Sequence, residues 1–138
     1  MSKIHIAYAT ITKHSKKLAH AIGERLYVKP DNILDKPLYE AVDLLYIVGG
    51  IYGGESLPAL IDFVKSLDNN KVKKVALITS CASKIHVQKT IRTILEDKNI
   101  PVIDEHICQG SFLFFKMGHP NKDDLKEAVD FAFKLSER

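Results

Sequence analysis

Near its start the chain reads Ile4-His5-Ile6-Ala7-Tyr8-Ala9 and then Thr10-Ile11-Thr12-Lys13-His14-Ser15, before an amphipathic run that begins at Lys16. A strand that ends in a hydroxyl-rich turn and then opens a helix is suited to hold a phosphate. The N–H groups of a first helical turn have no partner within the helix, and the helix dipole favours an anion there. The hydroxyls of Thr10, Thr12 and Ser15 can donate further hydrogen bonds. The stretch predicts the first strand–helix unit of a nucleotide-binding sheet, although the same hydroxyls could simply cap the helix.

Strand and helix patterns alternate along the rest of the chain. Apolar runs predict strands, and segments with an apolar period of about 3.6 residues predict helices. The predicted strands are 3–9, a short one at 32–34, 44–48, 74–79 and 102–107, and the predicted helices are 15–27, 56–67, 84–98 and one after Pro120. Ser56 is the candidate N-cap of the second helix, with Pro58 in its first turn. This alternation predicts one α/β domain over residues 1–138, an open parallel sheet with helices on both faces.

Three predicted loops lie at the carboxyl ends of strands, where sheets of this kind bind their ligands. They are residues 10–15, 49–55 and 80–83. The second loop contains Gly49-Gly50 and Gly53-Gly54, which is more glycine than a tight turn needs. It is either a plain strand-to-helix turn or a place where the backbone approaches a ligand closely.

Composition excludes several classes of protein. The sequence is 46% hydrophobic and 27% charged, as in ordinary globular proteins, and no run approaches the length of about 18 apolar residues that a membrane span needs. The start lacks the features of a secretory signal, and Cys81 and Cys108 form no CxxC motif, so we expect reduced thiols in a cytoplasmic protein. The net charge of +3 comes with scattered lysines, which argues against a nucleic-acid module.

No motif for catalysis by side chains is present. The chain lacks the GxSxG, GxxxxGK[ST] and GxGxxG patterns, and its histidines show no metal-ligand spacing, so we expect no catalytic residue and no metal. His119 is interpreted as a structural or surface residue. The segment Phe112–Phe115 could cover the core, act as a lid or dock a partner.

The three loops resemble those of the flavodoxin family. Thr10, Thr12, His14 and Ser15 fall on the positions that wrap the phosphate of FMN, the glycine-rich segment 49–58 resembles the second loop beside the flavin ring, and the segment 80–83 falls where the third loop meets the ring. The resemblance implies a three-layer αβα sandwich with a five-stranded parallel sheet in the order 2-1-3-4-5. It implies that FMN is bound by Thr10, Ile11, Thr12, Lys13, His14, Ser15, Gly50, Ile51, Tyr52, Gly53, Gly54, Ser80, Cys81 and Ala82.

One position departs from the family pattern. Lys13 stands where the family usually has glycine, so its ammonium could add a charge-assisted contact to the phosphate, or the loop could have lost FMN. Tyr52 could stack on the ring or be an ordinary loop residue. Cys81 could face the site or be an inert buried thiol.

The function that the resemblance implies is electron transfer. The expected protein is a monomeric flavodoxin that accepts electrons from a reductase and passes them to an acceptor protein, without nucleic acid or membrane partners. The alternatives are an FMN-dependent oxidoreductase of the quinone reductase or protoporphyrinogen oxidase type, and a degenerate relative that has lost FMN. Because the chain is basic, we expect a less negative flavin potential than in an acidic flavodoxin, and docking to acidic surfaces.

Overall fold

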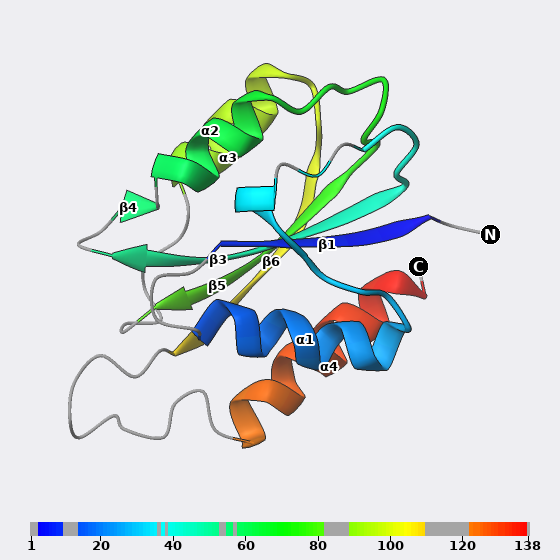
Figure 1. Ribbon diagram of the computed structural model, residues 1–138, viewed down its shortest axis with the longest axis vertical. Helices are drawn as coiled ribbons and strands as arrows, with labels where there is room; N and C mark the ends of the chain where they lie inside the picture. The colour runs from blue at the N-terminus through cyan, green and yellow to red at the C-terminus, as the bar shows by residue number, and fades with distance from the viewer. Residues whose placement is uncertain are drawn as a thin grey trace.

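The computed structural model describes residues 3–9, 14–35, 37, 39–52, 55–56, 58–81, 89–109 and 122–137. Their helices and strands form three layers, with α2 and α3 above the sheet in Figure 1 and α1 and α4 below it. In chain order the elements are β1 (Ile4–Tyr8), α1 (His14–Leu26), β2 (Asp31–Asn32), the 3-10 helix η1 (Ile33–Asp35), β3 (Leu44–Tyr52), β4 (Glu55–Ser56), α2 (Pro58–Lys65), β5 (Val75–Cys81), α3 (Lys89–Asp97), β6 (Val102–Gln109) and α4 (Lys122–Ser136).

The sheet has the order β2-β1-β3-β5-β6, with β4 paired to β3 outside this path. Every pair along the path is parallel, while β4 runs antiparallel to β3. When the parallel strands alone are numbered along the chain, their order is 2-1-3-4-5. The predicted flavodoxin-like sheet is therefore confirmed.

Alternating side chains of the central strands supply two hydrophobic cores. Leu45 and Ile47 belong to the core that includes residues of α2 and α3, whereas Tyr46 and Val48 belong to the core that includes residues of α1 and α4. All four are fully buried, as expected for a continuous apolar run in a strand covered on both faces. The predicted apolar faces of α1, α2 and α4 also contribute to these cores.

Several predicted boundaries were wrong. Residues 49–52 were predicted as loop but belong to β3, because Gly49 and Gly50 continue its ladder opposite Thr79 and Ser80 of β5. Glycine usually weakens a strand, so the sequence pattern placed the end of β3 too early.

Ser56 was also wrongly assigned. Ser56 lies in β4, where it pairs with Ile51 of β3, so it is not the N-cap of α2, which begins at Pro58. Pro58 at the first helical position suits a residue that has no N–H to leave unpaired. Ser80 and Cys81, predicted as loop, end β5, and the described part of α3 begins at Lys89; the predicted helix start at residue 84 lies outside the described residues.

Two helices end in left-handed turns. Tyr27 after α1 has φ 59°, and the N–H of Val28 donates to the carbonyl of Gly23 at 3.0 Å. Asn99 after α3 has φ 61°, and the N–H of Ile100 donates to the carbonyl of Leu95 at 2.9 Å. Both are Schellman ends, which satisfy carbonyls of the last helical turn. Of the helices in the described ranges, none has the length and apolarity to cross a membrane.

Candidate functional site

The carboxyl ends of β1, β3 and β5 meet at one edge of the sheet. Tyr8 of β1 lies opposite Val48 of β3, and the N–H of Ala9 donates to the carbonyl of Val48 at 3.0 Å. One residue later, Gly49 of β3 lies opposite Thr79 of β5. The neighbouring strands β1 and β3 are followed by crossovers in opposite directions along the sheet, because β1 leads to β2 on one side and β3 leads to β5 on the other. This is the switch point at which such sheets bind ligands.

Helix α1 begins at this same edge. The arrowheads of β3 and β5 and the first turn of α1 lie on the left of Figure 1. The 13-residue helix has no acidic residue in its first turn, so no carboxylate there competes with an incoming anion. Its backbone fits a phosphate group, because the N–H groups of a first turn have no partners within the helix.

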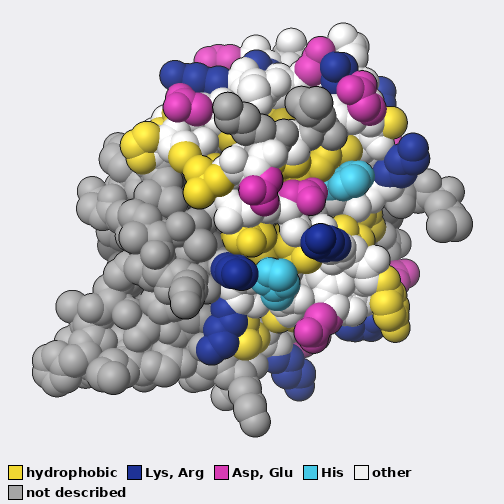
Figure 2. Space-filling view, viewed as in Figure 1, with side chains coloured by type: hydrophobic (Ala, Val, Ile, Leu, Met, Phe, Trp, Pro, Cys, Tyr) yellow, Lys and Arg dark blue, Asp and Glu magenta, His cyan; other side chains and the backbone are white. Residues whose placement is uncertain are grey.

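Positive charge follows along α1. Lys16, Lys17 and His20 are exposed. In Figure 2, Lys and Arg side chains lie beside a histidine in the lower half of the view, where Figure 1 draws α1, and an acidic side chain lies below it. The first two turns of α1 thus expose basic and no acidic side chains.

Strand β3 extends beyond its parallel partners into a short antiparallel pair with β4. Ile51 lies opposite Ser56, and Tyr52 lies opposite Glu55. The backbone of Gly50, Ile51 and Tyr52 therefore continues past the end of β1, at the place where the resemblance predicts the flavin ring. Stacking of Tyr52 on that ring stays a prediction.

The structure gathers half of the predicted binding residues at this edge. His14 and Ser15 open α1, Gly50, Ile51 and Tyr52 end β3, and Ser80 and Cys81 end β5. The other predicted residues lie outside the described ones, as do His119 and Phe112–Phe115; these binding residues are Thr10, Ile11, Thr12, Lys13, Gly53, Gly54 and Ala82.

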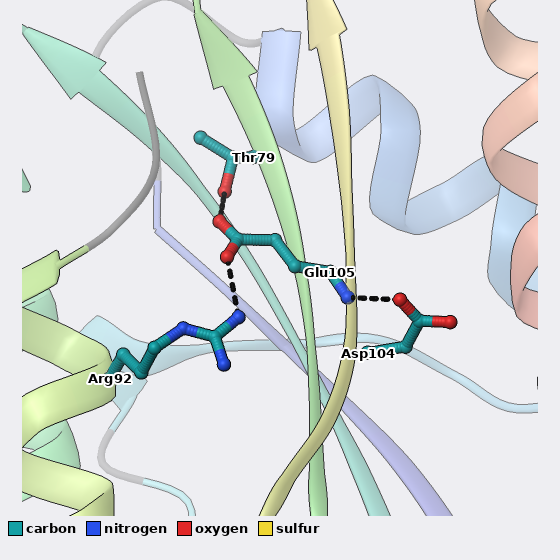
Figure 3. A network of polar contacts seen from close by, with 4 residues as sticks. All are labelled: Thr79, Arg92, Asp104 and Glu105. Carbon is teal, nitrogen blue, oxygen red and sulfur yellow. Dashed lines mark hydrogen bonds and ion pairs between the residues drawn. The ribbon is translucent and has the colours of Figure 1, made fainter. Parts of the chain in front are cut away.

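A polar network beside this edge was not predicted from the sequence. Thr79 is fully buried in β5, and its hydroxyl donates to Oε2 of Glu105 in β6 at 3.2 Å. Nη2 of Arg92 in α3 lies 2.8 Å from Oε1 of the same carboxylate. Figure 3 shows the carboxylate held between the two donors, with the N–H of Glu105 bonded to Asp104. The sequence did contain a signal for this network, because Glu105 lies inside the predicted strand 102–107 and a buried acidic side chain needs partners.

A second hydroxyl–carboxylate pair lies near the opposite edge of the sheet. Tyr39 donates to Oδ2 of Asp31 in β2 at 2.9 Å, and its ring packs against those of His5 and Phe63. Burial, and secondly the hydrogen bond to Asp31, raises the pKa of Tyr39 above its ordinary value. Burial likewise raises the pKa of Tyr46, which donates to the carbonyl of Ala132 in α4. Both phenols therefore stay protonated and are structural rather than acid–base groups.

Comparisons with known proteins agree with this architecture. No protein-family model matches the chain. It is 30% identical to the uncharacterized protein MJ0298 of Methanocaldococcus jannaschii, over 94% of this chain and 95% of that protein.

Solved structures extend the comparison. Oxidised flavodoxin 2 from Bacillus cereus matches with a TM-score of 0.70 and 17% identity over 99% of both chains. An azoreductase from Bacillus anthracis matches with a TM-score of 0.70 and 13% identity over 97% of this chain and 100% of that one. A flavoprotein in complex with FMN from Lactobacillus acidophilus matches with a TM-score of 0.62 and 15% identity over 78% and 93%. The predicted resemblance to flavodoxins is confirmed for the fold.

Proposed function

We propose that this chain, which belongs to the family of the M. jannaschii protein MJ0298 and has the flavodoxin-like fold, binds FMN and carries electrons between two redox proteins. The observation that carries the proposal is the edge where α1, β3 and β5 meet. There a helix start without acidic residues adjoins a strand with two glycines. A phosphate and a flat ring need these two features side by side.

Each segment has a part in binding. The first turn of α1 and the hydroxyls of Thr10, Thr12 and Ser15 would hold the phosphate, with Lys13 adding a charge-assisted contact. The backbones of β3 after Gly50 and of β5 at Ser80 and Cys81 would flank the ring. Bound FMN supplies the electron-transfer chemistry, and the protein orients it and shields it from water.

A second candidate is an enzyme with the same cofactor. The similarity of fold to an azoreductase favours it specifically, since that protein is named for the reduction of its own substrate. A carrier needs no substrate pocket beside the ring, whereas an oxidoreductase does. If the FMN-loaded protein oxidises NAD(P)H and reduces a quinone or azo dye with many turnovers, it is an enzyme. If its flavin is reduced and oxidised only by other redox proteins, it is a carrier.

The first experiment is reconstitution with FMN. Purified protein is incubated with excess FMN, desalted and examined by absorbance; retained flavin bands support the proposal. The double variant Thr12→Ala/Ser15→Ala should lose most of the bound flavin. The matched control Thr93→Ala/Ser136→Ala removes a threonine and a serine from α3 and α4 and should retain it. A flat visible spectrum of the wild type, or equal retention by both double variants, would contradict the proposed site.

The basic surface predicts the charge of the partner. We propose that the acceptor presents an acidic face, given the net charge of +3 and the exposed Lys16 and Lys17 beside the site. Small oxidants of opposite charge test this with the FMN-loaded, reduced protein. Anionic ferricyanide should react more slowly as salt is added, whereas a cationic hexaammine complex should react faster. The opposite salt trends would contradict an acidic partner.

A further inference from the structure

The network of Thr79, Glu105 and Arg92 joins three elements next to the proposed site. Glu105 lies on the edge strand β6, Thr79 on β5 and Arg92 on α3. The Glu105 side chain is 8% exposed and that of Arg92 is 37% exposed, so the ion pair is covered on its carboxylate side. Figure 3 shows Thr79 and Arg92 on different oxygens of one carboxylate.

The position of Thr79 links this network to the carboxyl edge. Thr79 lies opposite Gly49 of β3 on one side and opposite Ile107 of β6 on the other. It directly precedes Ser80 and Cys81, the last two residues of β5 and the ones expected to meet the ring. A strand rises about 3.3 Å per residue, so the residues proposed to contact the ring lie only about 3 to 7 Å along β5 from Thr79.

The chemistry makes the arrangement specific. A carboxylate with little exposure is costly unless its oxygens are paired, and a hydrogen bond to a charged group is stronger than one between neutral groups. Arg92 holds the carboxylate in place from the helix side. The carboxylate in turn helps to hold the Thr79 side chain, since its charge makes the hydrogen bond that it accepts stronger than one to a neutral acceptor.

We propose that Glu105 is a positioning residue, which, held by Arg92, fixes the carboxyl end of β5 through Thr79 and so sets how Ser80 and Cys81 meet the flavin. This inference rests on the proposed function for the ligand, but its effect on β5 does not require FMN. Glu105 acts through Thr79 and is not itself a catalytic residue.

The test uses Thr79→Val, which removes the hydrogen bond to Glu105 and keeps the shape of the buried side chain. Thr79→Ser keeps the hydroxyl and serves as the conservative variant. Tyr39→Phe is the matched control, because it removes the same kind of bond, to Asp31, on the β2 side of the sheet. Two quantities are measured: amide hydrogen exchange of the FMN-free protein, and the dissociation constant of FMN.

Thr79→Val should speed exchange of the Ser80 and Cys81 amides by about tenfold and raise the FMN dissociation constant by about fivefold, which is the size expected for one such bond. Thr79→Ser should restore both quantities. Tyr39→Phe should change exchange near β2 and leave the FMN constant alone. Uniform acceleration across the sheet, no local change at Ser80 and Cys81, or an equal loss of FMN affinity in Tyr39→Phe would overturn the proposal. Local acceleration in Thr79→Val, combined with a wild type that takes up no FMN, would support the positioning of β5 and overturn the proposed function.

Discussion

Replacing Gly23 with alanine should destabilise the protein, although the same change in most helices is stabilising. A Cβ built on Gly23 would lie 2.4 Å from the carbonyl oxygen of Val28 and 3.0 Å from Cδ and Cγ of Pro30. Carbon–oxygen contacts normally begin near about 3.3 Å, so the chain at 28–30 would have to move by roughly 1 Å. Backbone and a buried proline ring cannot yield as a flexible side chain would.

The balance of terms gives the magnitude. Crowding of this kind costs about 1–3 kcal/mol, and loss of the hydrogen bond from Val28 to Gly23 costs about 1 kcal/mol. The gain from replacing a helical glycine is about 1 kcal/mol. The net loss of unfolding free energy is about 1–3 kcal/mol, measured by urea unfolding followed by circular dichroism. Lys17→Ala, an exposed site on the same helix, is the control and should stay within about 0.5 kcal/mol. A stabilised Gly23→Ala would refute the close packing of residues 28–30 on α1.

Three further predictions use the same unfolding assay. Tyr27→Gly should stabilise the protein by about 1 kcal/mol, because Tyr27 is 93% exposed and adopts a left-handed φ. Asn99→Gly should gain less, because asparagine tolerates that conformation. Equal gains would argue against strain at Tyr27 as the cause. Arg92→Met should cost about 1–3 kcal/mol by removing its ion pair with the largely buried Glu105 carboxylate, and Glu105→Gln in the same chain should recover part of that loss; additive losses would mean that the two side chains are not coupled. Because the pKa values of Tyr39 and Tyr46 are raised in the folded protein, their stabilising effect is present below the ordinary value of 10.0 and declines above it, as the unfolded chain ionises first. Each phenol should steepen the alkaline loss by up to about 1.4 kcal/mol per pH unit, so Tyr39→Phe and Tyr46→Phe should each make that loss shallower, and an unchanged slope would contradict the burial of the phenol.

The alternation of strands and helices was predictable because it depends on periodicity, whereas the strand order was implied by the resemblance to flavodoxins. The run from Leu44 to Val48 has no polar residue, which identifies a central strand, and the apolar positions of α1 and α4 repeat at helical spacing. Two-residue elements follow no such period. Thus β2 was expected only as a short strand at 32–34, and β4 was missed because its pairing depends on the path of β3 rather than on Glu55 and Ser56 themselves.

The network of Thr79, Glu105 and Arg92 was missed for a different reason. Arg92 is 13 residues from Glu105, and Thr79 is 26 residues from it, so no local pattern joins them. Their contact depends on which face of β6 meets α3, and the pairing of β5 with β6 is irregular between Val75 and Ala76. An irregularity of that kind changes which residues of β6 face α3, which is a property of the folded sheet rather than of the local sequence.

The position of the two glycines in β3 bears on what the edge can bind. Residues 49 and 50 are in the ladder with Thr79 and Ser80, so part of their backbone hydrogen-bonding capacity is used within the sheet. Glycine contributes no packing to a central strand, and its presence there is typical of places where a ligand or another chain segment comes close. Gly49 and Gly50 therefore give this edge a stretch of backbone that is fixed by the sheet and carries no side chain.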